Sequence, residues 1–309
     1  IPLVGNSNFI KNLKNSLEKI SKSKSRILIN GPMGSGKKFI AYCIHKYSNN
    51  AKNLLNIIDF RDLVNEDLEI MFTEKSENIN QNLFVSSNNN TLVLNNIDLL
   101  PVSFQKKILN YLENDNYFNN FKINLNVKII AITSKIIDHE ISKGNFIRNL
   151  YDRLNVVNIK VPPINKRRED ILPLCNYYLD YFNKNKKYNF ILSKKASKQL
   201  EIYDWPGNIR QIINYIEKTI IINQEHNSKN DYELQNLPID MGENDLNKST
   251  SSHFDLSLKE ARQNFEKEYL ISQIKRFNGN IIKISEFTGM ERTALYRKFK
   301  SLNITLDNK

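Results

Sequence analysis

The sequence has two cysteines in 309 residues, which is too few for a disulfide framework. Its four histidines are scattered, and neither they nor the cysteines show the spacing of a zinc site. Apolar runs such as residues 220–222 are far too short to cross a bilayer. The sequence does not begin with the charged segment and following apolar segment of a signal peptide. These absences argue against a disulfide-rich, zinc-binding or membrane protein and favour a reducing, cytoplasmic setting.

The length and charge of the chain set broad limits on what it can be. At 309 residues it has room for two or three domains with a substantial core. Its net charge of +12 permits an acidic partner, although such a charge is informative only where it is concentrated. Because the first residue is Ile1 rather than Met, we expect the natural protein to extend further at its N-terminal side.

A glycine-rich turn stands between an apolar run and a helical pattern in RILINGPMGSGKKFIA, residues 26–41. The spacing G-x-x-x-x-G-K is typical of a P-loop, whose backbone N–H groups face a phosphate chain while the lysine reaches its far end. The predicted nucleotide-binding residues here are Gly31, Pro32, Met33, Gly34, Ser35, Gly36, Lys37 and Lys38. Lys38 replaces the Ser or Thr that usually holds Mg²⁺, so ATP or ADP is the predicted ligand and Mg²⁺ is left open. A turn without function is the alternative.

Two further apolar runs, residues 91–94 and 127–133, have a helical pattern between them. Strands that alternate with helices predict an α/β fold in which a parallel sheet is covered on both faces. Ligands bind such a sheet at the carboxyl ends of its strands. Asn95 and Asn96 follow the second run and Ser134 follows the third, so these side chains are expected near the P-loop.

The two asparagines weaken any catalytic assignment. ATP-hydrolysing P-loop proteins normally carry at this point an Asp that holds the Mg²⁺ shell and often a Glu that polarises water. An amide cannot take a proton, and loss of a general base costs roughly 10² to 10⁴ in rate. Asp98 is the nearest carboxylate in sequence and is expected to point away from the strand end. We therefore predict nucleotide binding without useful turnover, with no catalytic residue and no metal ligand.

The remaining chain divides by its patterns. After Pro162 and Pro163 the periodicity is helical, over residues 168–183, 193–203 and 208–223. Residues 224–253 are polar with little periodicity, as in a linker or, alternatively, a long surface loop. The predicted domains are an α/β nucleotide-binding subdomain over residues 1–162, a helical lid over 163–223, a linker over 224–254 and a helix-turn-helix domain over 255–309.

The C-terminal segment has a long helical stripe, a short helix over residues 281–287, a turn at Gly289 and a basic helix over 291–302. This order is typical of a helix-turn-helix that binds double-stranded DNA. The residues predicted to contact DNA are Arg292, Thr293, Tyr296, Arg297 and Lys300. A bidentate arginine on guanine is worth about 1–3 kcal/mol in discrimination. The alternative is an ordinary solvated helix face. Residues 256–274 are the predicted dimer surface.

Four segments resemble a known family: GPMGSGKK, LYDRLNVVNIKVPPINKRREDILPL, WPGNIRQIIN and LKEARQNFEKEYLISQIKRFNGNIIKISEFTGMERTALYRKFKSLNI. They are similar to the AAA+ and Fis-like DNA-binding parts of bacterial NtrC-group enhancer-binding response regulators, nearest the NtrX type. The resemblance implies an AAA+ parallel sheet with a helical lid, followed by an all-α Fis-like domain. It also implies a higher oligomer formed through the AAA+ module and a dimer formed through the C-terminal domain. The resemblance further implies an upstream receiver domain, outside these residues, which a sensor kinase would phosphorylate.

The resemblance also assigns roles, residue by residue. Lys37 would contact the β- and γ-phosphates, Arg210 would sense nucleotide from the lid, and Arg153 would reach the neighbouring subunit's nucleotide. The positions that depart from the family pattern are Lys38 for Glu, Asn95-Asn96 for Asp-Glu, Ser134 for Asn and Ile147 for Arg, with Arg148 displaced by one. The GAFTGA loop that touches sigma-54 should lie between Met71 and Thr91, where this chain has FTEKSENINQNLFVSSNNN.

These features together favour a sequence-specific DNA-binding transcription regulator of a nitrogen-type two-component system. Its AAA+ module would bind nucleotide, lack efficient hydrolysis and not engage sigma-54, so whether the chain is an enzyme is left open. The alternative is an active, ATP-hydrolysing, sigma-54-dependent activator. A P-loop kinase acting on a small molecule fits less well, because the chain ends in a DNA-reading pattern.

Overall fold

The computed structural model describes residues 2–73, 75–113, 125–186, 189–223, 232–234, 258–277, 280–302 and 304. The chain divides into two compact units, Ile1–Leu237 and Pro238–Lys309. Among the helices within these described ranges, none has both the length and the apolarity needed to span a membrane.

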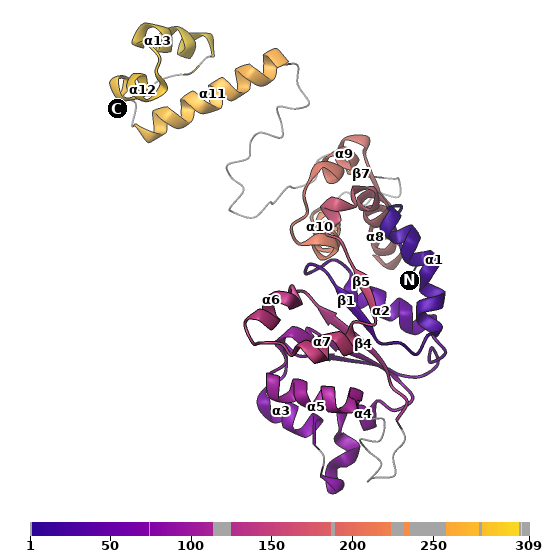
Figure 1. Cartoon of the computed structure of the whole chain (residues 1–309). Coiled ribbons are helices and arrows are strands. Elements are labelled where there is room, and N and C mark those ends of the chain that lie inside the picture. The colour runs from indigo at the N-terminus through magenta and orange to yellow at the C-terminus, as the bar shows by residue number, and fades with distance from the viewer. Residues whose placement is uncertain are drawn as a thin grey trace. The chain divides into compact units, whose positions relative to one another are not determined.

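A five-stranded parallel sheet with the order β2-β3-β4-β1-β5 forms the centre of the first unit (Figure 1). The strands are β1 Ile27–Asn30, β2 Leu55–Asp59, β3 Thr91–Asn95, β4 Lys128–Thr133 and β5 Val157–Lys160. This confirms the α/β fold with a parallel sheet. The sequence patterns missed β2 and β5, which are the two edge strands. Both are only partly buried and mix polar with apolar residues, so they lack the apolar runs of β1, β3 and β4.

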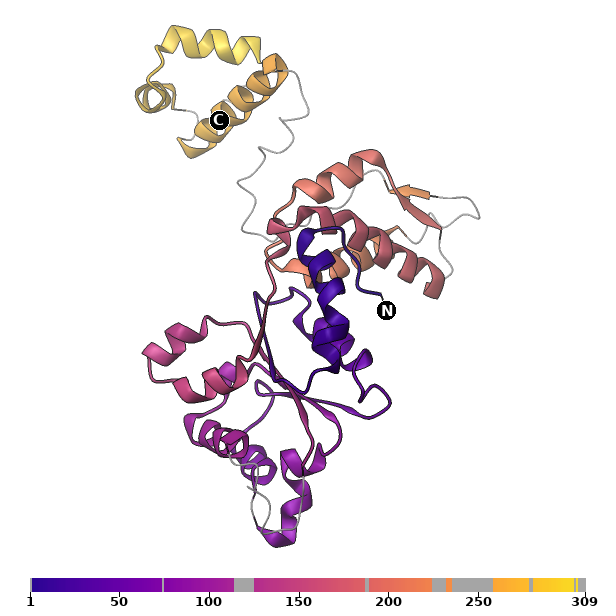
Figure 2. The same ribbon diagram turned by 45° about the vertical axis from the view of Figure 1, so that its right-hand side comes forward.

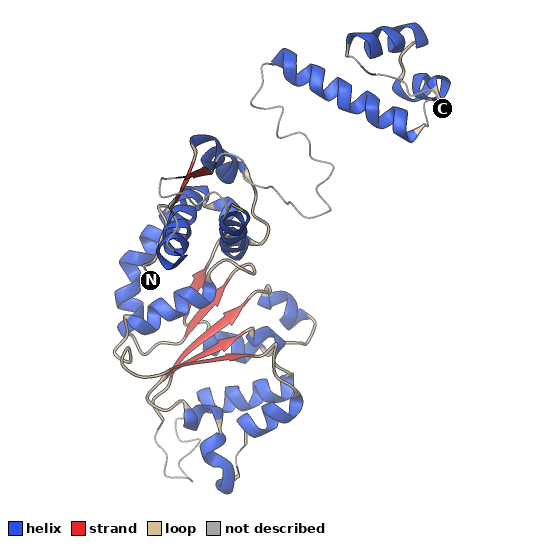
Figure 3. Cartoon of the chain, turned by 180° about the vertical axis from the view of Figure 1, so that it is seen from behind, coloured by secondary structure: helices blue, strands red, loops and turns tan. Residues whose placement is uncertain are grey.

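Helices cover both faces of the sheet, as Figure 3 shows from behind. They are α1 Asn8–Lys22, α2 Lys37–Lys46, α3 Asn65–Met71, α4 Leu83–Ser86, α5 Val102–Glu113, α6 Ile137–Ser142 and α7 Arg148–Leu154. On β3, Leu92 and Leu94 belong to the core with α3, α4, α5 and α7, whereas Val93 belongs to the opposite core with α1 and α2. Successive strand residues therefore alternate between two cores, which makes the central strands apolar throughout.

A helical lid follows the sheet in sequence. Its elements are α8 Ile171–Lys186, α9 Lys194–Ile202, α10 Asn208–Ile222 and the parallel strand pair β6 Phe190–Leu192 and β7 Tyr232–Leu234. The lid has its own core, in which the buried Trp205 donates its indole N–H to the Leu200 carbonyl at 2.8 Å. Figure 2 shows the lid helices beyond the end of the sheet. The lid contacts the loop that follows β1 through a hydrogen bond from the Arg210 N–H to the Gly34 carbonyl.

The predicted linker over residues 224–254 needs a correction. Strand β7 lies within this range and pairs with β6 of the lid, so the expectation that the whole range lacks regular structure was wrong at this point. The polar composition of the range gave no periodic signal for so short a strand. The rest of the predicted linker lies outside the described residues.

The second unit consists of α11 Leu258–Arg276, α12 Ile281–Thr288 and α13 Arg292–Ser301. One residue from each of the first two helices and two from the third form its buried core: Leu270, Ile284, Leu295 and Phe299. Helix α12 ends at Gly289, whose φ of +67° is left-handed, the conformation that glycine adopts most readily at a helix end. The helix-turn-helix predicted from the sequence is confirmed.

Candidate functional site

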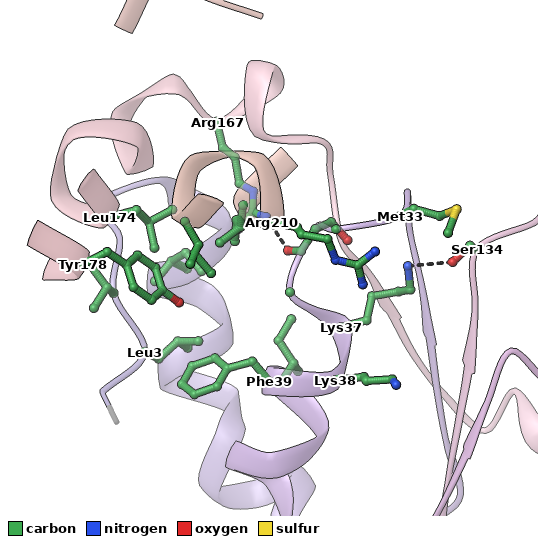
Figure 4. Close-up of a pocket in the computed structure, with 18 of the residues that line it drawn as sticks. Leu3, Met33, Lys37, Lys38, Phe39, Ser134, Arg167, Leu174, Tyr178 and Arg210 are labelled. Carbon is green, nitrogen blue, oxygen red and sulfur yellow. Dashed lines mark hydrogen bonds between the residues drawn. The ribbon is translucent and has the colours of Figure 1, made fainter. Parts of the chain in front are cut away.

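A cavity of about 310 Å³ lies between the P-loop, the strand ends and the lid (Figure 4). Its polar lining residues, apart from the loop itself, include Lys37, Lys38, Arg61, Asn95, Asn96, Ser134, Arg167, Arg210 and Asn214. Its apolar lining residues include Leu3, Val4, Phe39, Leu174, Tyr178, Ile209 and Ile213. The site thus combines a cationic part beside the P-loop with an apolar part, a division that matches a ligand with a phosphate chain and a flat base.

The P-loop approaches the lid so closely that one of its positions requires glycine. Gly34 has φ of +73°, and a Cβ atom there would lie 2.2 Å from the Gly207 carbonyl oxygen. No side chain fits without moving the backbone, and the left-handed conformation adds strain for any other residue. The glycine at this position is therefore a packing requirement as well as part of the phosphate-binding pattern.

Three consecutive P-loop carbonyls accept hydrogen bonds from the lid side. The side-chain amide of Asn208 donates to the Met33 carbonyl at 2.9 Å. The backbone N–H of Arg210 donates to the Gly34 carbonyl at 3.2 Å, and the guanidinium of Arg167 donates to the Ser35 carbonyl at 2.7 Å. The lid therefore holds the loop through its backbone oxygens and not through the N–H groups that a phosphate chain would need. Any ligand that shifts this loop also changes the hydrogen bonds that position the lid.

Lys37 is buried, and its ammonium group is held in the loop. It donates to the carbonyls of Gly31 and Pro32 at 2.7 and 2.8 Å and to Ser134 Oγ at 2.9 Å. Burial lowers the pKa of Lys37 to about 8, partly opposed by Asp98. A phosphate group beside this lysine would stabilise its charged form, because an opposite charge raises the pKa of an ammonium. Of the predicted loop residues, those from Met33 to Lys38 line the cavity.

A carboxylate that the sequence reading missed lies at the end of β2. Asp59 accepts hydrogen bonds from the side-chain amides of Asn95 at 2.6 Å and Asn96 at 2.5 Å. Its oxygens also lie 2.9 Å from Lys38 Nζ and 3.1 Å from Arg61 Nη2. Burial alone would raise the pKa of this carboxyl group, but hydrogen bonds from Arg61, Lys38 and Asn96 outweigh burial and hold its pKa below the ordinary range. Asp59 is therefore already neutralised by its neighbours.

Asp98 is the nearest carboxylate in sequence to the two asparagines, but Asp59 is the carboxylate that accepts their hydrogen bonds. Asp98 is buried, accepts a hydrogen bond from Thr133 Oγ1 at 2.7 Å and lies 4.0 Å from Lys135 Nζ. Asp59 was missed because it is distant in sequence, whereas the parallel register places it directly opposite Asn95 on the neighbouring strand. Asn96 adopts a left-handed φ of +56°, which asparagine tolerates better than most residues and which turns its amide toward Asp59.

The two arginines assigned by resemblance have different surroundings. Arg210 is exposed, lines the cavity, and its guanidinium points into the same region as Lys37 (Figure 4). Arg153 lies on α7 with its Nε 3.5 Å from Glu113 and half of its side chain in solvent. Ile147 is the N-cap of α7, and its N–H donates to Gln105. In the part of the chain that the structure describes, no group of three or more His, Cys, Asp or Glu side chains could hold a metal ion.

Helix α13 has one face buried in the core of its unit and an opposite, outer face exposed to solvent. Leu295 and Phe299 are buried, whereas the five residues predicted to contact DNA are all exposed: Arg292, Thr293, Tyr296, Arg297 and Lys300. Lys298, on the same helix, pairs instead with Glu266 of α11. The outer face therefore presents three cations and a tyrosine to solvent, the residue types that contact phosphates and base edges in a groove.

Three family models match the chain in succession. The sigma-54 interaction domain matches residues 3–160, the AAA+ ATPase lid domain matches 165–253, and the bacterial regulatory protein, Fis family, matches 261–302. All three ranges include residues that the structure does not describe.

Curated relatives match along almost the whole chain. A putative response regulator NtrX-like from Rickettsia typhi is 38% identical over 317 residues, covering 98% of this chain and 66% of the relative. The nitrogen assimilation regulatory protein NtrX of Azorhizobium caulinodans is 34% identical over 314 residues, covering 98% and 69%. The chain thus spans just under two thirds of the Rickettsia typhi relative's length.

Solved structures of NtrX from Brucella abortus are also similar. The complex with ATP has a TM-score of 0.70 at 31% identity and covers 98% of this chain and 69% of that one. The complex with ADP has the same TM-score and identity and covers 97% and 69%.

Proposed function

Because this chain belongs to the NtrX-type response regulators, with sigma-54 interaction, AAA+ lid and Fis-type domains, we propose that it is a sequence-specific DNA-binding transcription regulator. Its AAA+ module binds ATP or ADP at the P-loop and does not turn ATP over efficiently. Nucleotide acts as a ligand that sets the conformation or assembly of the module. The proposed location is the cytoplasm, where DNA and a sensor kinase are both accessible.

The observation that carries the proposal is the amide pair at the end of β3. Asn95 and Asn96 line the cavity, and both amides donate to Asp59. A general base needs a free oxygen and a pKa near the working pH. Asp59 offers neither, because its oxygens are bonded to cations and amides and its pKa is lowered. The groups nearest the P-loop therefore favour binding over hydrolysis.

The segment where the family carries its sigma-54 loop supports the second part of the proposal. Apart from Glu74, residues 72–90 are described and contain a 3₁₀ helix, Ser76–Gln81, and the short helix α4. Leu83 and Phe84 of α4 are buried in the core beneath the sheet. Most of the 3₁₀ helix is exposed, but the segment lacks the glycine-rich motif and its C-terminal part is anchored in the core, so we propose that it does not engage sigma-54.

The second unit supplies DNA binding and a dimer surface. On α11, Phe265 and Tyr269 are 55% and 38% exposed, and their rings stack with centroids 6.2 Å apart. Exposed aromatic pairs on one helix face fit a second copy of the same helix. We propose a dimer through α11, a higher oligomer through the AAA+ module with Arg153 reaching the neighbouring nucleotide, and a cognate sensor kinase as the upstream partner.

The function is tested by measuring nucleotide binding and turnover on the same preparation. ADP and ATP should bind with saturable heat in a calorimeter, while phosphate release stays at the level of a Lys37→Ala control. The physical reason is that the P-loop is intact but the general base, worth roughly 10² to 10⁴ in rate, is missing. Steady phosphate release that disappears in Lys37→Ala would contradict the proposal and favour the ATP-driven activator.

DNA recognition is tested with Arg297→Ala. An operator is first selected from a random-sequence pool with the natural chain, and affinity is then measured at several salt concentrations. We expect Arg297→Ala to weaken specific binding about 5- to 150-fold, corresponding to about 1–3 kcal/mol for one arginine on a base edge. The affinity of the natural chain should fall steeply with salt, because bound phosphates release counterions.

The matched control for this measurement is Arg262→Ala. Arg262 lies in the same unit on α11, and its Nε pairs with Glu266 at 3.2 Å. Glu266 keeps its pair with Lys298 of α13, and the exposed outer face of α13 is unchanged, so operator affinity should change much less. Equal losses in the two variants would mean that net charge, rather than the outer face of α13, controls binding.

A further inference from the structure

The cavity does not suit the metal ion that P-loop nucleotide sites usually contain. Mg²⁺ prefers oxygen ligands, most often carboxylates and substrate phosphates. None of the described residues that line the cavity is Asp or Glu, whereas five are Lys or Arg. Asn95 and Asn96 direct their N–H groups at Asp59, and the position after Lys37 holds an ammonium instead of a hydroxyl. The residues present therefore do not fit a protein-held magnesium ion.

Lys38 occupies a fixed place in this arrangement. It lies in the first turn of α2, next to Lys37, and lines the cavity. Asp59 holds its ammonium at 2.9 Å, and Arg61 pairs with the same carboxylate at 3.1 Å. A lysine held in this way loses less side-chain entropy when it meets a ligand than a free one does. Half of the Lys38 side chain remains exposed, so its charge is accessible to a bound phosphate.

From these contacts we propose that Lys38, anchored by Asp59, supplies the positive charge that Mg²⁺ supplies in other P-loop sites. The chain accordingly binds ATP and ADP without a metal ion. This inference rests on the proposed nucleotide-binding function. It specifies in addition that the nucleotide binds without a metal ion.

The charge balance of the cavity supports the same conclusion. Besides Lys38 and Arg61, the lining includes Lys37 and Arg210, neither of which has a carboxylate within salt-bridge distance among the described residues. Free nucleotide carries more negative charge than its magnesium complex. A cationic cavity without carboxylates attracts the more negative ligand at least as strongly, whereas a divalent cation near Lys38 would be repelled. Binding should therefore persist when magnesium is removed.

The test is a calorimetric titration of the natural chain with ADP, once in excess MgCl₂ and once in excess EDTA at equal ionic strength. The dissociation constant in EDTA should be within about threefold of that in MgCl₂, or tighter. Binding that weakens tenfold or more in EDTA would overturn the inference while leaving nucleotide binding intact. Absence of binding in both buffers would overturn the nucleotide-binding function and this inference with it.

Three variants locate the effect at Lys38. In EDTA, Lys38→Ala should bind ADP about tenfold more weakly, as expected for the loss of one charged contact. Lys46→Ala, which removes an exposed lysine at the far end of the same helix, should bind like the natural chain. Lys38→Thr/Asp59→Asn/Asn95→Asp, which restores a hydroxyl and a carboxylate and removes the like charge that Asp59 would place beside Asp at position 95, should bind well only with MgCl₂. If Lys38→Ala binds ADP in EDTA as tightly as the natural chain, the inference is wrong.

Discussion

The variant Asp59→Asn/Asn95→Asp/Asn96→Glu should hydrolyse ATP about 10²-fold faster than the natural chain. Asp at position 95 would supply a carboxylate for magnesium, and Glu at position 96 would supply a general base. A general base contributes roughly 10² to 10⁴ to the rate. We expect the lower end of that range, because Lys38 and Ser134 remain unchanged. Phosphate release measured in MgCl₂ with saturating ATP gives the rate directly.

The change at Asp59 is needed because the natural carboxylate lies within hydrogen-bonding distance of both asparagines. Asn95→Asp/Asn96→Glu alone would put three carboxylates in one place, where like charges raise each other's pKa and destabilise the fold. This double variant should be at least about tenfold slower than the triple variant. Glu at position 96 also has to adopt the left-handed φ of +56°, so melting temperatures must be compared. Equal rates in both variants would show that Asp59 does not oppose the restored acids.

Phe299→Ala should unfold the C-terminal unit and abolish specific DNA binding while leaving nucleotide binding unchanged. Among the described residues, Phe299 is one of the four that form the buried core of this unit. Truncating a buried phenylalanine costs about 3–5 kcal/mol. A domain of this size rarely has more than about 3–5 kcal/mol of stability from its core. Hydrogen exchange of residues 258–302 in the whole chain, together with operator binding, measures both effects.

Ile282→Ala is the control for this second prediction. Ile282 lies on α12 in the same unit, but its side chain is 48% exposed and lies outside the buried core. Its truncation removes a similar apolar group without creating a cavity, so the exchange rates of α11 and α13 should stay close to those of the natural chain. If Phe299→Ala retains slow exchange and operator affinity, the small core does not control the stability of this unit.

Much of the fold was predictable from the sequence because its signals are local. The apolar runs of β1, β3 and β4 are continuous since both faces of the central strands are buried, and each is followed at once by its polar functional residues. The glycine pattern of the P-loop and the turn at Gly289 follow from backbone conformations that few other residues adopt. The edge strands β2 and β5 gave no such signal, because they are half-buried and their mixed composition resembles a loop.

The amino-acid sequence by itself determined that amides stand at the end of β3, that a lysine follows Lys37, and that the last described helix of the second unit is basic. Only the tertiary structure decided what those amides and that lysine contact. Asp59 stands 36 residues before Asn95 in the chain, and only the parallel pairing of β2 with β3 brings the two side chains together. Such pairing depends on how a whole strand joins the sheet, which no local pattern around either residue encodes.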